Sequence, residues 1–362
     1  MDGDLPGPQS GPMETFETLV RAEFAPKNTF LNTASSGLLP ARTVAALHEA
    51  VAVRAEGRPL GPLWEDVEAA RASFARLAGV PVARVAAGPS VAAQTGLVAA
   101  SLPPGAEVLT AEDDFTSVVN PFHVRGDLKV RAVPLERLAE SVRPGTALVA
   151  VSAAQSADGR IADLPALREA ATAHGARTYV DFSQAAGWLP MEAEGFDFTV
   201  CTTYKWLLGP HGAAVLVVPE DHGDLTPILA TWVSAEKPWD SCYGPVQELA
   251  HSARRFDGPP ALFSYAGLRH SLALIEELGV AAVHAHDLAL ADRFRAGLAT
   301  LGREALPAPG SAIVSVPGLG HRQPELGRAG IEVSNRAGNL RASFHLYNTT
   351  ADVDRLLDVL SG

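Results

Sequence analysis

The stretch that decides the fold begins with the mostly apolar run Phe196-Asp197-Phe198-Thr199-Val200-Cys201. It continues through Thr202-Thr203-Tyr204 to Lys205 and then Trp206-Leu207-Leu208-Gly209-Pro210-His211-Gly212. Only four of the 29 basic residues are lysines, and Lys27, Lys129 and Lys237 lie in segments typical of a surface. An amine held among small and apolar side chains loses the hydration of its charged form, so its pKa falls and the neutral nucleophile becomes accessible. A lysine that forms a Schiff base with a carbonyl cofactor needs this property, so Lys205 is the candidate catalytic residue.

The composition bounds the class of protein. At 362 residues and 37.9 kDa, the chain is long enough for two domains. A net charge of −12 and a pI near 5.4 argue against nucleic acid or an anionic membrane as a partner. Cys201 and Cys242 are the only cysteines and neither lies in a metal-binding spacing, so we expect no disulfide framework and no metal site. Residues 1–14 have no signal-peptide pattern, and no apolar run reaches membrane-spanning length, so a cytoplasmic protein is expected.

Short apolar runs alternate with helix-period segments over most of the chain. This alternation predicts an α/β fold with a mostly parallel, seven-stranded sheet covered on both faces. The expected strands are 84–87, 107–110, 130–133, 147–152, 178–181, 198–201 and 213–218, and the expected helices between them are 91–101, 116–124 and 164–174.

The pattern changes after residue 219. A loop-rich bridge, 220–260, precedes a predicted smaller α+β domain with helices 263–278, 281–301 and 351–360 and strands 312–316, 332–334 and 340–344. The expected division of the chain is a disordered leader 1–14, an N-terminal segment 15–40 that packs with the small domain, a large domain 41–250 and a small domain 251–362.

Four further groups fall at strand ends or helix starts, where ligands bind in open α/β sheets. Gly88-Pro89-Ser90-Val91 leads into a helix and could bind a phosphate, although the same residues are a common N-cap. Asp181 ends a strand, where a carboxylate could hold a pyridinium nitrogen protonated or only cap a turn. Gln184 could reach a ring hydroxyl or be a solvated turn residue. Phe115 could stack on a flat ring or belong to the core.

Taken in order, these segments resemble the class V aminotransferases of the fold-type I pyridoxal-phosphate enzymes, which have the aspartate aminotransferase-like fold. That group contains cysteine desulfurases, kynureninase and isopenicillin epimerase-like proteins. The resemblance covers essentially everything after the leader, and its two most specific blocks surround Lys205 and Arg341. It is carried by Phe30-Leu31-Asn32-Thr33-Ala34-Ser35-Ser36-Gly37, Gly88-Pro89-Ser90, Asp114-Phe115-Thr116-Ser117 with Asn120-Pro121-Phe122, Val180-Asp181-Phe182-Ser183-Gln184-Ala185, Thr202-Thr203-Tyr204-Lys205-Trp206 and Gly338-Asn339-Leu340-Arg341-Ala342-Ser343-Phe344-His345-Leu346-Tyr347-Asn348-Thr349.

The resemblance implies pyridoxal 5'-phosphate as the cofactor and assigns residues to its ring. Lys205 would form the Schiff base and move the Cα proton of the substrate. Asp181 would pair with the pyridine nitrogen and Gln184 with the ring hydroxyl. Phe115 would cover the ring.

The resemblance also assigns a phosphate side and a substrate side. Ser90 and the Val91 amide would take the phosphate, helped by Thr202 and by Tyr204, which stands where the family usually has His. Arg341 would bind the substrate α-carboxylate as a bidentate fork. The substrate side would also be lined by Ala34 and Ser35.

The cysteines bear on the reaction. Cysteine desulfurases need a nucleophilic Cys on a small-domain loop, and no Cys follows Cys242. Cys201 lies in an expected strand, where it behaves as a small buried hydrophobe, so persulfide chemistry is disfavoured.

Two segments look most like the hercynylcysteine sulfoxide lyases of ergothioneine biosynthesis. These are residues 253–263 and Arg336-Ala337-Gly338. The likeness implies a C–S lyase that releases pyruvate and ammonia from a cysteine S-conjugate or sulfoxide. An aminotransferase, epimerase or decarboxylating enzyme remains an alternative, because these reactions begin from the same complex. The resemblance also implies a homodimer in which residues 254–260 complete the partner's pocket.

Two alternatives lie outside catalysis on this cofactor. A non-catalytic binding protein of the same fold is disfavoured by the presence of Lys205, Asp181 and Arg341 together. A nucleotide-binding protein that uses the Gly88 turn is disfavoured because the chain lacks the glycine-rich phosphate motifs.

Overall fold

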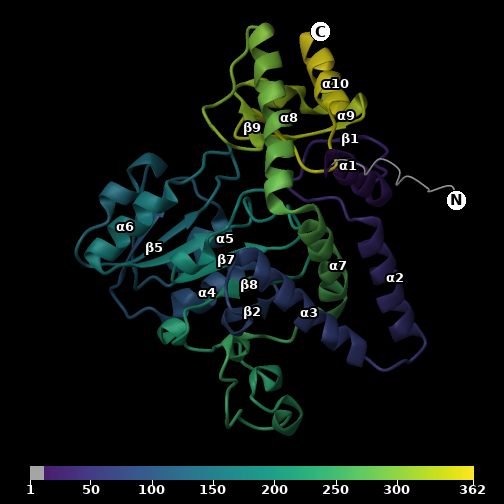
Figure 1. Cartoon of the computed structure of the whole chain (residues 1–362). Coiled ribbons are helices and arrows are strands. Elements are labelled where there is room, and N and C mark those ends of the chain that lie inside the picture. Colours follow the sequence, from purple (N-terminus) through teal and green to yellow (C-terminus); the bar gives the residue numbers. More distant parts are fainter. Residues whose placement is uncertain (1–11) are drawn as a thin grey trace, which may run out of the picture.

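The structure is a computed structural model and describes residues 12–362. The large domain is built on a seven-stranded sheet of order β2-β8-β7-β6-β5-β3-β4, in which β8 alone runs antiparallel to its neighbours (Figure 1). The predicted α/β fold and its seven strands are confirmed. The strands are β2 (Val85–Gly88), β3 (Glu107–Ala111), β4 (Lys129–Val133), β5 (Thr146–Ser152), β6 (Arg177–Asp181), β7 (Phe198–Thr202) and β8 (Ala214–Val217).

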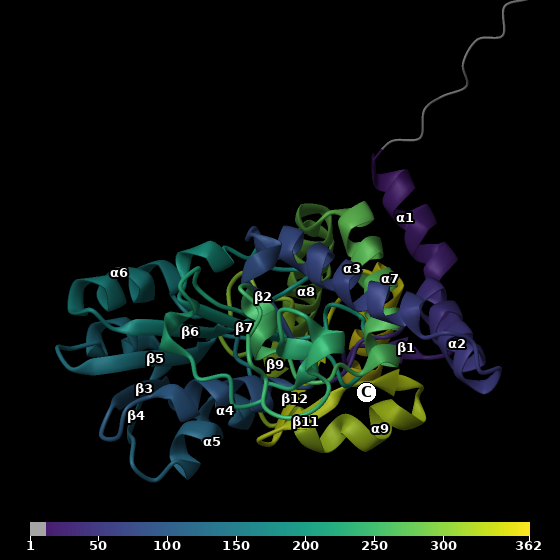
Figure 2. The ribbon, with the colours of Figure 1, turned by 90° about the horizontal axis from the view of Figure 1, so that it is seen from below.

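Helices cover both faces of this sheet, because successive strand residues point to opposite sides. On β8, Leu216 packs with the α4 and α5 side chains, whereas Val215 and Val217 pack with those of α3 and α7. Figure 2 shows α4 and α5 below the strands and α3 and α7 above them. The helices of this domain are α2 (Ala41–Ala55), α3 (Gly61–Ala78), α4 (Val91–Ser101), α5 (Thr116–Val124), α6 (Leu164–His174) and α7 (Leu262–Leu278).

The small domain lies beyond one edge of the large sheet. It contains the antiparallel sheet β11-β12-β9 and the two-stranded parallel sheet β1-β10, covered by long helices (Figure 1). The strand expected at 332–334 is wrong as one unit, because Val333 separates two strands that pair in different sheets. The elements are β1 (Thr29–Phe30), α8 (Val280–Thr300), β9 (Ile313–Val316), α9 (Gln323–Arg328), β10 (Ile331–Glu332), β11 (Ser334–Arg336), β12 (Asn339–Ser343) and α10 (Thr350–Ser361).

The division between the domains falls later than residue 250. Tyr265, Leu268 and Leu272 on α7 belong to the same buried cluster as Phe74 on α3. The large-domain core therefore extends through α7, and the chain enters the small domain near Gly279, where φ is +79°. The periodicity of α7 alone could not show which layer its buried face meets.

The N-terminal segment lies against both domains. Helix α1 (Pro12–Glu23) places Phe16 and Val20 against a buried cluster that includes Trp206 and Tyr347. Residues 12–14 are therefore the first turn of a helix and not part of a disordered leader, in keeping with the tolerance of the first helical turn for Pro. The remainder of the expected leader, residues 1–11, lies outside the described residues.

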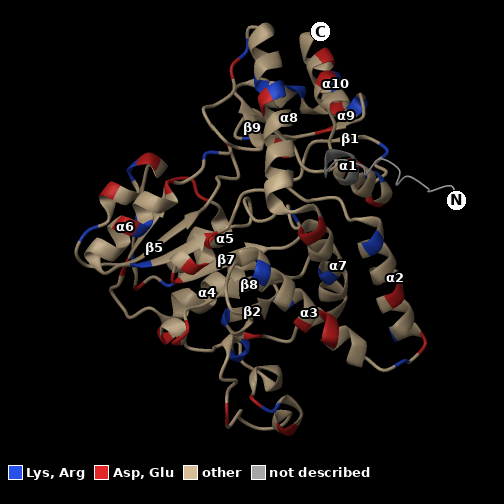
Figure 3. Cartoon of the chain, viewed as in Figure 1, with Lys and Arg blue, Asp and Glu red and all other residues tan. Residues whose placement is uncertain are grey.

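Figure 3 shows acidic and basic residues interspersed along the outer helices of both domains. No helix among residues 12–362 is long and apolar enough to cross a membrane.

Candidate active site

The site lies at the edge of the large sheet where its parallel strands end. Asp181 is the last residue of β6, and Thr202 is the last residue of its parallel neighbour β7. Gly88 ends β2, which runs in the same direction as β7 because both strands are antiparallel to β8. The carboxyl ends of parallel strands meet at one edge of a sheet, which explains why the segments carrying Lys205, Asp181 and Phe115 converge there.

Lys205 is almost wholly buried, with 4% of its surface exposed. Its Nζ lies 4.8 Å from the centre of the Phe115 ring and 5.8 Å from that of Tyr204. Burial lowers the pKa of Lys205 to about 8, although the negative charge of Asp181 works in the opposite direction. The lowered pKa expected from the sequence is thus present, and about a tenth of the amine is neutral at pH 7.

Asp181 interacts with Lys205 electrostatically, since the charge of each residue shifts the pKa of the other. Its Oδ1 accepts a hydrogen bond from the Ser183 amide at 2.7 Å. Burial raises the pKa of Asp181 to about 6, and the hydrogen bonds from Ser183 and the charge of Lys205 limit that rise. A carboxylate in this state is stabilised by any cationic group placed against it.

Phe115 is held by Asp114, a residue to which the sequence alone assigned no role. The backbone N–H of Phe115 donates to Asp114 Oδ1 at 2.6 Å, and the Ser152 amide donates to Oδ2 of the same carboxylate at 2.8 Å. Asp114 is buried, whereas 41% of Phe115 is exposed. An exposed aromatic ring fixed over a buried amine is available to a flat ligand.

Two of the expected phosphate residues, Ser90 and Val91, lie at the start of α4. Ser90 is the N-cap of α4, and its Oγ accepts a hydrogen bond from the Ala93 amide at 3.2 Å. Val91 is the first helical residue, so its N–H has no partner within the helix. Tyr204 stacks on His211 with a ring separation of 3.8 Å.

One residue at this helix start was missed. Gln94 is fully buried, and neither its amide nitrogen nor its amide oxygen has a hydrogen-bond partner among the described residues. It packs so closely over Gly88 that a Cβ there would lie 1.9 Å from Gln94 Nε2. A larger residue at position 88 would force the Gln94 side chain to move, and no local pattern identified Gln94.

Gln184 does lie in the site, but its amide is already engaged. Its Nε2 donates to the Ala34 carbonyl at 2.8 Å and to Ser156 Oγ at 3.0 Å, and its Oε1 accepts from Trp206 Nε1 at 2.8 Å. It therefore ties together the N-terminal segment, the loop after β5 and the residue that follows Lys205.

His345 of the small domain contacts Trp206, the residue that follows Lys205. Its Nε2 donates to the Trp206 carbonyl oxygen at 3.0 Å, and its Nδ1 lies 2.9 Å from Asp287 Oδ2. His345 and Asp287 are both fully buried. The residue next to the lysine is thus fixed from two domains.

Arg341 is buried without an acid partner among the described residues. It is 1% exposed, its Nη2 donates to Ser35 Oγ at 2.7 Å and to Ser334 Oγ at 3.2 Å, and its Nη1 donates to Ser156. Its Nε has no hydrogen-bond partner within residues 12–362. Burial, reinforced by the charge of Arg336, lowers the pKa of Arg341 to about 9. A buried guanidinium that meets only hydroxyl and carbonyl oxygens is a site for an anion.

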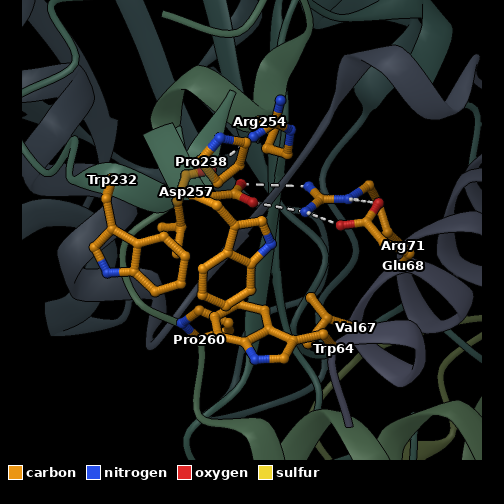
Figure 4. A pocket seen from close by; sticks show the side chains of 11 residues that line it. Trp64, Val67, Glu68, Arg71, Trp232, Pro238, Arg254, Asp257 and Pro260 are labelled. Atoms are coloured by element: carbon orange, nitrogen blue, oxygen red, sulfur yellow. Dashed lines mark hydrogen bonds and ion pairs between the residues drawn. The ribbon is translucent and has the colours of Figure 1, made fainter. Parts of the chain in front are cut away.

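A separate cavity of about 250 Å³ lies between α3 and the 232–260 loop (Figure 4). Trp64, Trp232 and Trp239 line one side of it, and the buried ion pair of Arg71 with Asp257 lines the other. None of the residues around Lys205 described above borders this cavity. It is therefore a distinct feature from the lysine site.

No cluster of three or more potential metal ligands occurs among residues 12–362. Cys201 is buried within β7, and Cys242 is exposed after the short helix Pro238–Ser241.

The fold and these groups define the class of protein, a pyridoxal-phosphate enzyme of fold type I. Residues 30–356 match the family described as aminotransferase class-V, and the chain belongs to that family. The expectation drawn from the sequence is confirmed at this level. The protein is an enzyme that acts on amino acids, and its cofactor is pyridoxal 5'-phosphate.

Curated relatives of several named activities share this family. The chain is 28% identical over 315 residues to "Uncharacterized aminotransferase YcbU" of Bacillus subtilis, covering 82% of this chain and 84% of the relative. It is 29% identical over 376 residues to "Isopenicillin N epimerase" of Streptomyces clavuligerus, covering 91% and 93%. A solved structure of "the cystine C-S lyase C-DES" with cysteine persulfide has the same fold, with a TM-score of 0.84 at 22% identity over 92% of this chain and 97% of that one.

The described residues fit this cofactor on the chemistry of their donors. A buried amine of lowered pKa can form a Schiff base with an aldehyde, and the unpaired buried carboxylate of Asp181 suits a cationic ring nitrogen. The exposed face of Phe115 and the free amides at the start of α4 suit a flat ring and a phosphate.

Proposed function

We propose that Lys205 is the residue that binds the cofactor and moves the substrate Cα proton. Its partly neutral state near pH 7 supports this role, because only the neutral amine is a nucleophile or a base. Asp181 would hold the ring nitrogen, Phe115 would cover the ring and Ser90 with the Val91 amide would bind the phosphate. Thr202 and Tyr204 would also contact the phosphate, and Gln184 would approach the ring hydroxyl if one of its present partners yields.

Arg341 would bind the α-carboxylate of the amino acid. The observation that carries the proposal is its complete burial without an acid partner among the described residues, since an unpaired buried guanidinium is costly unless an anion occupies the site. Ser35 and the Ala34 backbone lie beside it and would position that carboxylate.

We propose a C–S lyase as the reaction. When bound, the cofactor withdraws electrons from Cα, so the Cα proton can move to the Lys205 amine. The C–S bond at Cβ then breaks, the sulfur leaves as a thiolate or sulfenate with the electron pair, and 2-aminoacrylate hydrolyses to pyruvate and ammonia. No protein thiol is needed. The burial of Cys201 and the place of Cys242, before the small domain, support this choice over persulfide transfer to the enzyme.

The experiment measures pyruvate release from a panel of cysteine S-conjugates and sulfoxides, together with amino transfer to 2-oxo acids and loss of chirality at Cα. The panel is needed because relatives of the chain are named as an aminotransferase, an epimerase and kynureninase. Pyruvate release from the conjugates supports the lyase. Amino transfer or racemisation without pyruvate would replace it by an alternative from the same family.

A matched pair of lysine variants tests the role of Lys205. Lys205→Met should abolish the visible absorbance band of the cofactor-loaded protein that borohydride removes, whereas Lys129→Met, at an exposed lysine on β4, should leave it unchanged. A Lys205→Met protein with full turnover would contradict the assignment. A colourless wild type after incubation with the cofactor would instead favour a binding protein of this fold.

We also propose that the enzyme is a homodimer. Trp239 and Tyr243 are 72% and 95% exposed in the 220–260 bridge, and large apolar rings at a surface mark interaction sites. Residues 254–260 would contribute to the partner's pocket. Light scattering coupled to size exclusion tests this proposal, and a monomer with full activity would refute it.

A further inference from the structure

A second arginine faces the same site as Arg341. Arg336 ends β11, and the two-residue turn Ala337-Gly338 leads into β12. Ser334 pairs with Arg341, and Arg336 pairs with Asn339, so all four side chains lie on one face of this hairpin. The two guanidinium groups are thus diagonal neighbours on a single surface.

The two arginines meet at one oxygen atom. Ser35 Oγ accepts a hydrogen bond from Arg341 Nη2 at 2.7 Å and another from Arg336 Nη2 at 3.0 Å. Ser35 is held in turn by Asn32, whose Oδ1 lies 2.7 Å from the same hydroxyl. The guanidinium of Arg336 is therefore held toward the buried Arg341, although Arg336 itself is exposed.

Neither arginine has an acidic partner among residues 12–362. Other arginines of the chain form ion pairs, for example Arg293 with Asp354 and Arg42 with Glu277, although these pairs are also partly exposed. Within the described part of the chain, the one other hydrogen bond of the Arg336 guanidinium goes to the neighbouring Asn335 carbonyl. Two like charges on one face of a hairpin destabilise each other, and an anion between or beside them would relieve that repulsion.

We propose that Arg336 binds a second anionic group of the substrate, beside the α-carboxylate on Arg341. This inference rests on the proposed function, since it takes Arg341 as the carboxylate site. The substrate class is then an amino acid whose side chain carries a carboxylate, sulfinate or sulfonate, such as a cysteine S-conjugate that ends in one. Arg336 is exposed where Arg341 is buried, so the second group would lie toward the mouth of the site.

Paired carboxylate probes test this inference without turnover. Calorimetry with the cofactor-loaded enzyme compares succinate and glutarate with butyrate, which has a single carboxylate. One of the two dicarboxylates should bind about tenfold more tightly than butyrate, the gain expected from one further charge-assisted contact. Arg336→Gln should remove that gain and leave butyrate within about twofold of its wild-type affinity, and Arg336→Lys should retain part of the gain because it keeps the charge.

The matched control is Arg303→Gln, which makes the same charge change at an exposed arginine beyond the end of α8. It should keep the dicarboxylate preference in full. A wild type that binds both dicarboxylates no better than butyrate would overturn the inference, and so would an Arg336→Gln protein that keeps the preference. If Arg336→Gln does not fold, the salt dependence of the wild type decides. Added NaCl should weaken dicarboxylate binding more than butyrate binding, and equal weakening overturns the inference.

These outcomes are separable from those of the proposed reaction. Pyruvate release from neutral S-conjugates with no dicarboxylate preference would remove only the role of Arg336. A clear preference without pyruvate release would remove only the lyase and keep the anionic substrate class. The corresponding kinetic readout is KM, which Arg336→Gln should raise for anionic conjugates and not for neutral ones.

Discussion

Replacing Lys205 by Met should make the cofactor-free protein more stable at pH 7. Burial lowers the pKa of Lys205 from its ordinary 10.5 to about 8, so below pH 8 the folded chain holds a buried positive charge at a cost. One pKa unit corresponds to about 1.4 kcal/mol, so the free energy of unfolding should rise by up to about 3 kcal/mol. Met keeps an unbranched chain of similar volume and therefore leaves no large cavity.

The sign of the pH dependence follows from the same shift. Between pH 8 and 10.5 the unfolded chain binds a proton at Lys205 that the folded chain has lost, so the stability of the wild type rises with pH. The advantage of Lys205→Met should therefore shrink across this range. Because Lys205 also favours the charged form of Asp181, the single variant should gain less than the full amount, and Lys205→Met with Asp181→Asn should recover the remainder.

Urea unfolding of the apoprotein at pH 7, 8, 9 and 10 measures the effect. Lys129→Met is the control, because an exposed lysine should change stability by less than about 0.5 kcal/mol at every pH. Our reasoning would be refuted if Lys205→Met were less stable than the wild type at pH 7, or if the difference between them were constant with pH.

Asp181→Asn should stabilise the apoprotein at pH 7 by up to about 3 kcal/mol, because the raised pKa of Asp181, about 6, makes its ionisation in the folded chain costly above pH 6. The stabilisation should disappear below pH 4, so thermal melting at pH 7 and below pH 4 checks it. Turnover of this variant should fall at least about a hundredfold. Asp257→Asn should cost about 3–5 kcal/mol in urea unfolding because it removes the buried partner of Arg71 and leaves only the exposed Glu68, whereas Glu68→Gln should cost under about 1 kcal/mol. Arg341→Lys should raise KM for the amino acid about a hundredfold in steady-state kinetics, because an ammonium cannot form the bidentate contact; an unchanged KM would place the α-carboxylate elsewhere.

Local pattern predicted the elements of the large domain well. The helices expected at 91–101, 116–124 and 164–174 coincide with α4, α5 and α6, and each of the seven strands is displaced by at most one residue at either end. Amphipathic helices and buried strands leave clear periods in a sequence, and such periods depend only on which residues face the core. The helices α1, α2 and α3 were not predicted, although α3 supplies part of the main core.

Packing between segments that are distant in the sequence could not be predicted as well from local patterns. The strand expected at 332–334 is divided between two sheets, because residues 331–332 pair with Thr29 and Phe30 while residues 334–336 pair with β12. Helix α7 joins the large domain because its apolar face meets α3. A local pattern shows that a face is apolar, but it does not show which partner covers that face.

The sequence by itself determined the class of chemistry. A rare lysine after a buried strand, an aspartate at the end of the neighbouring strand and an arginine block far downstream are each local signals, and their order is enough to indicate the family. Tertiary structure alone decided how these groups act on one another. Burial sets the pKa values of Lys205 and Asp181, and the meeting of Arg336 and Arg341 at Ser35 joins residues about three hundred positions apart. Electrostatic energies depend on distance and on exclusion of water, and both arise only when the chain has folded.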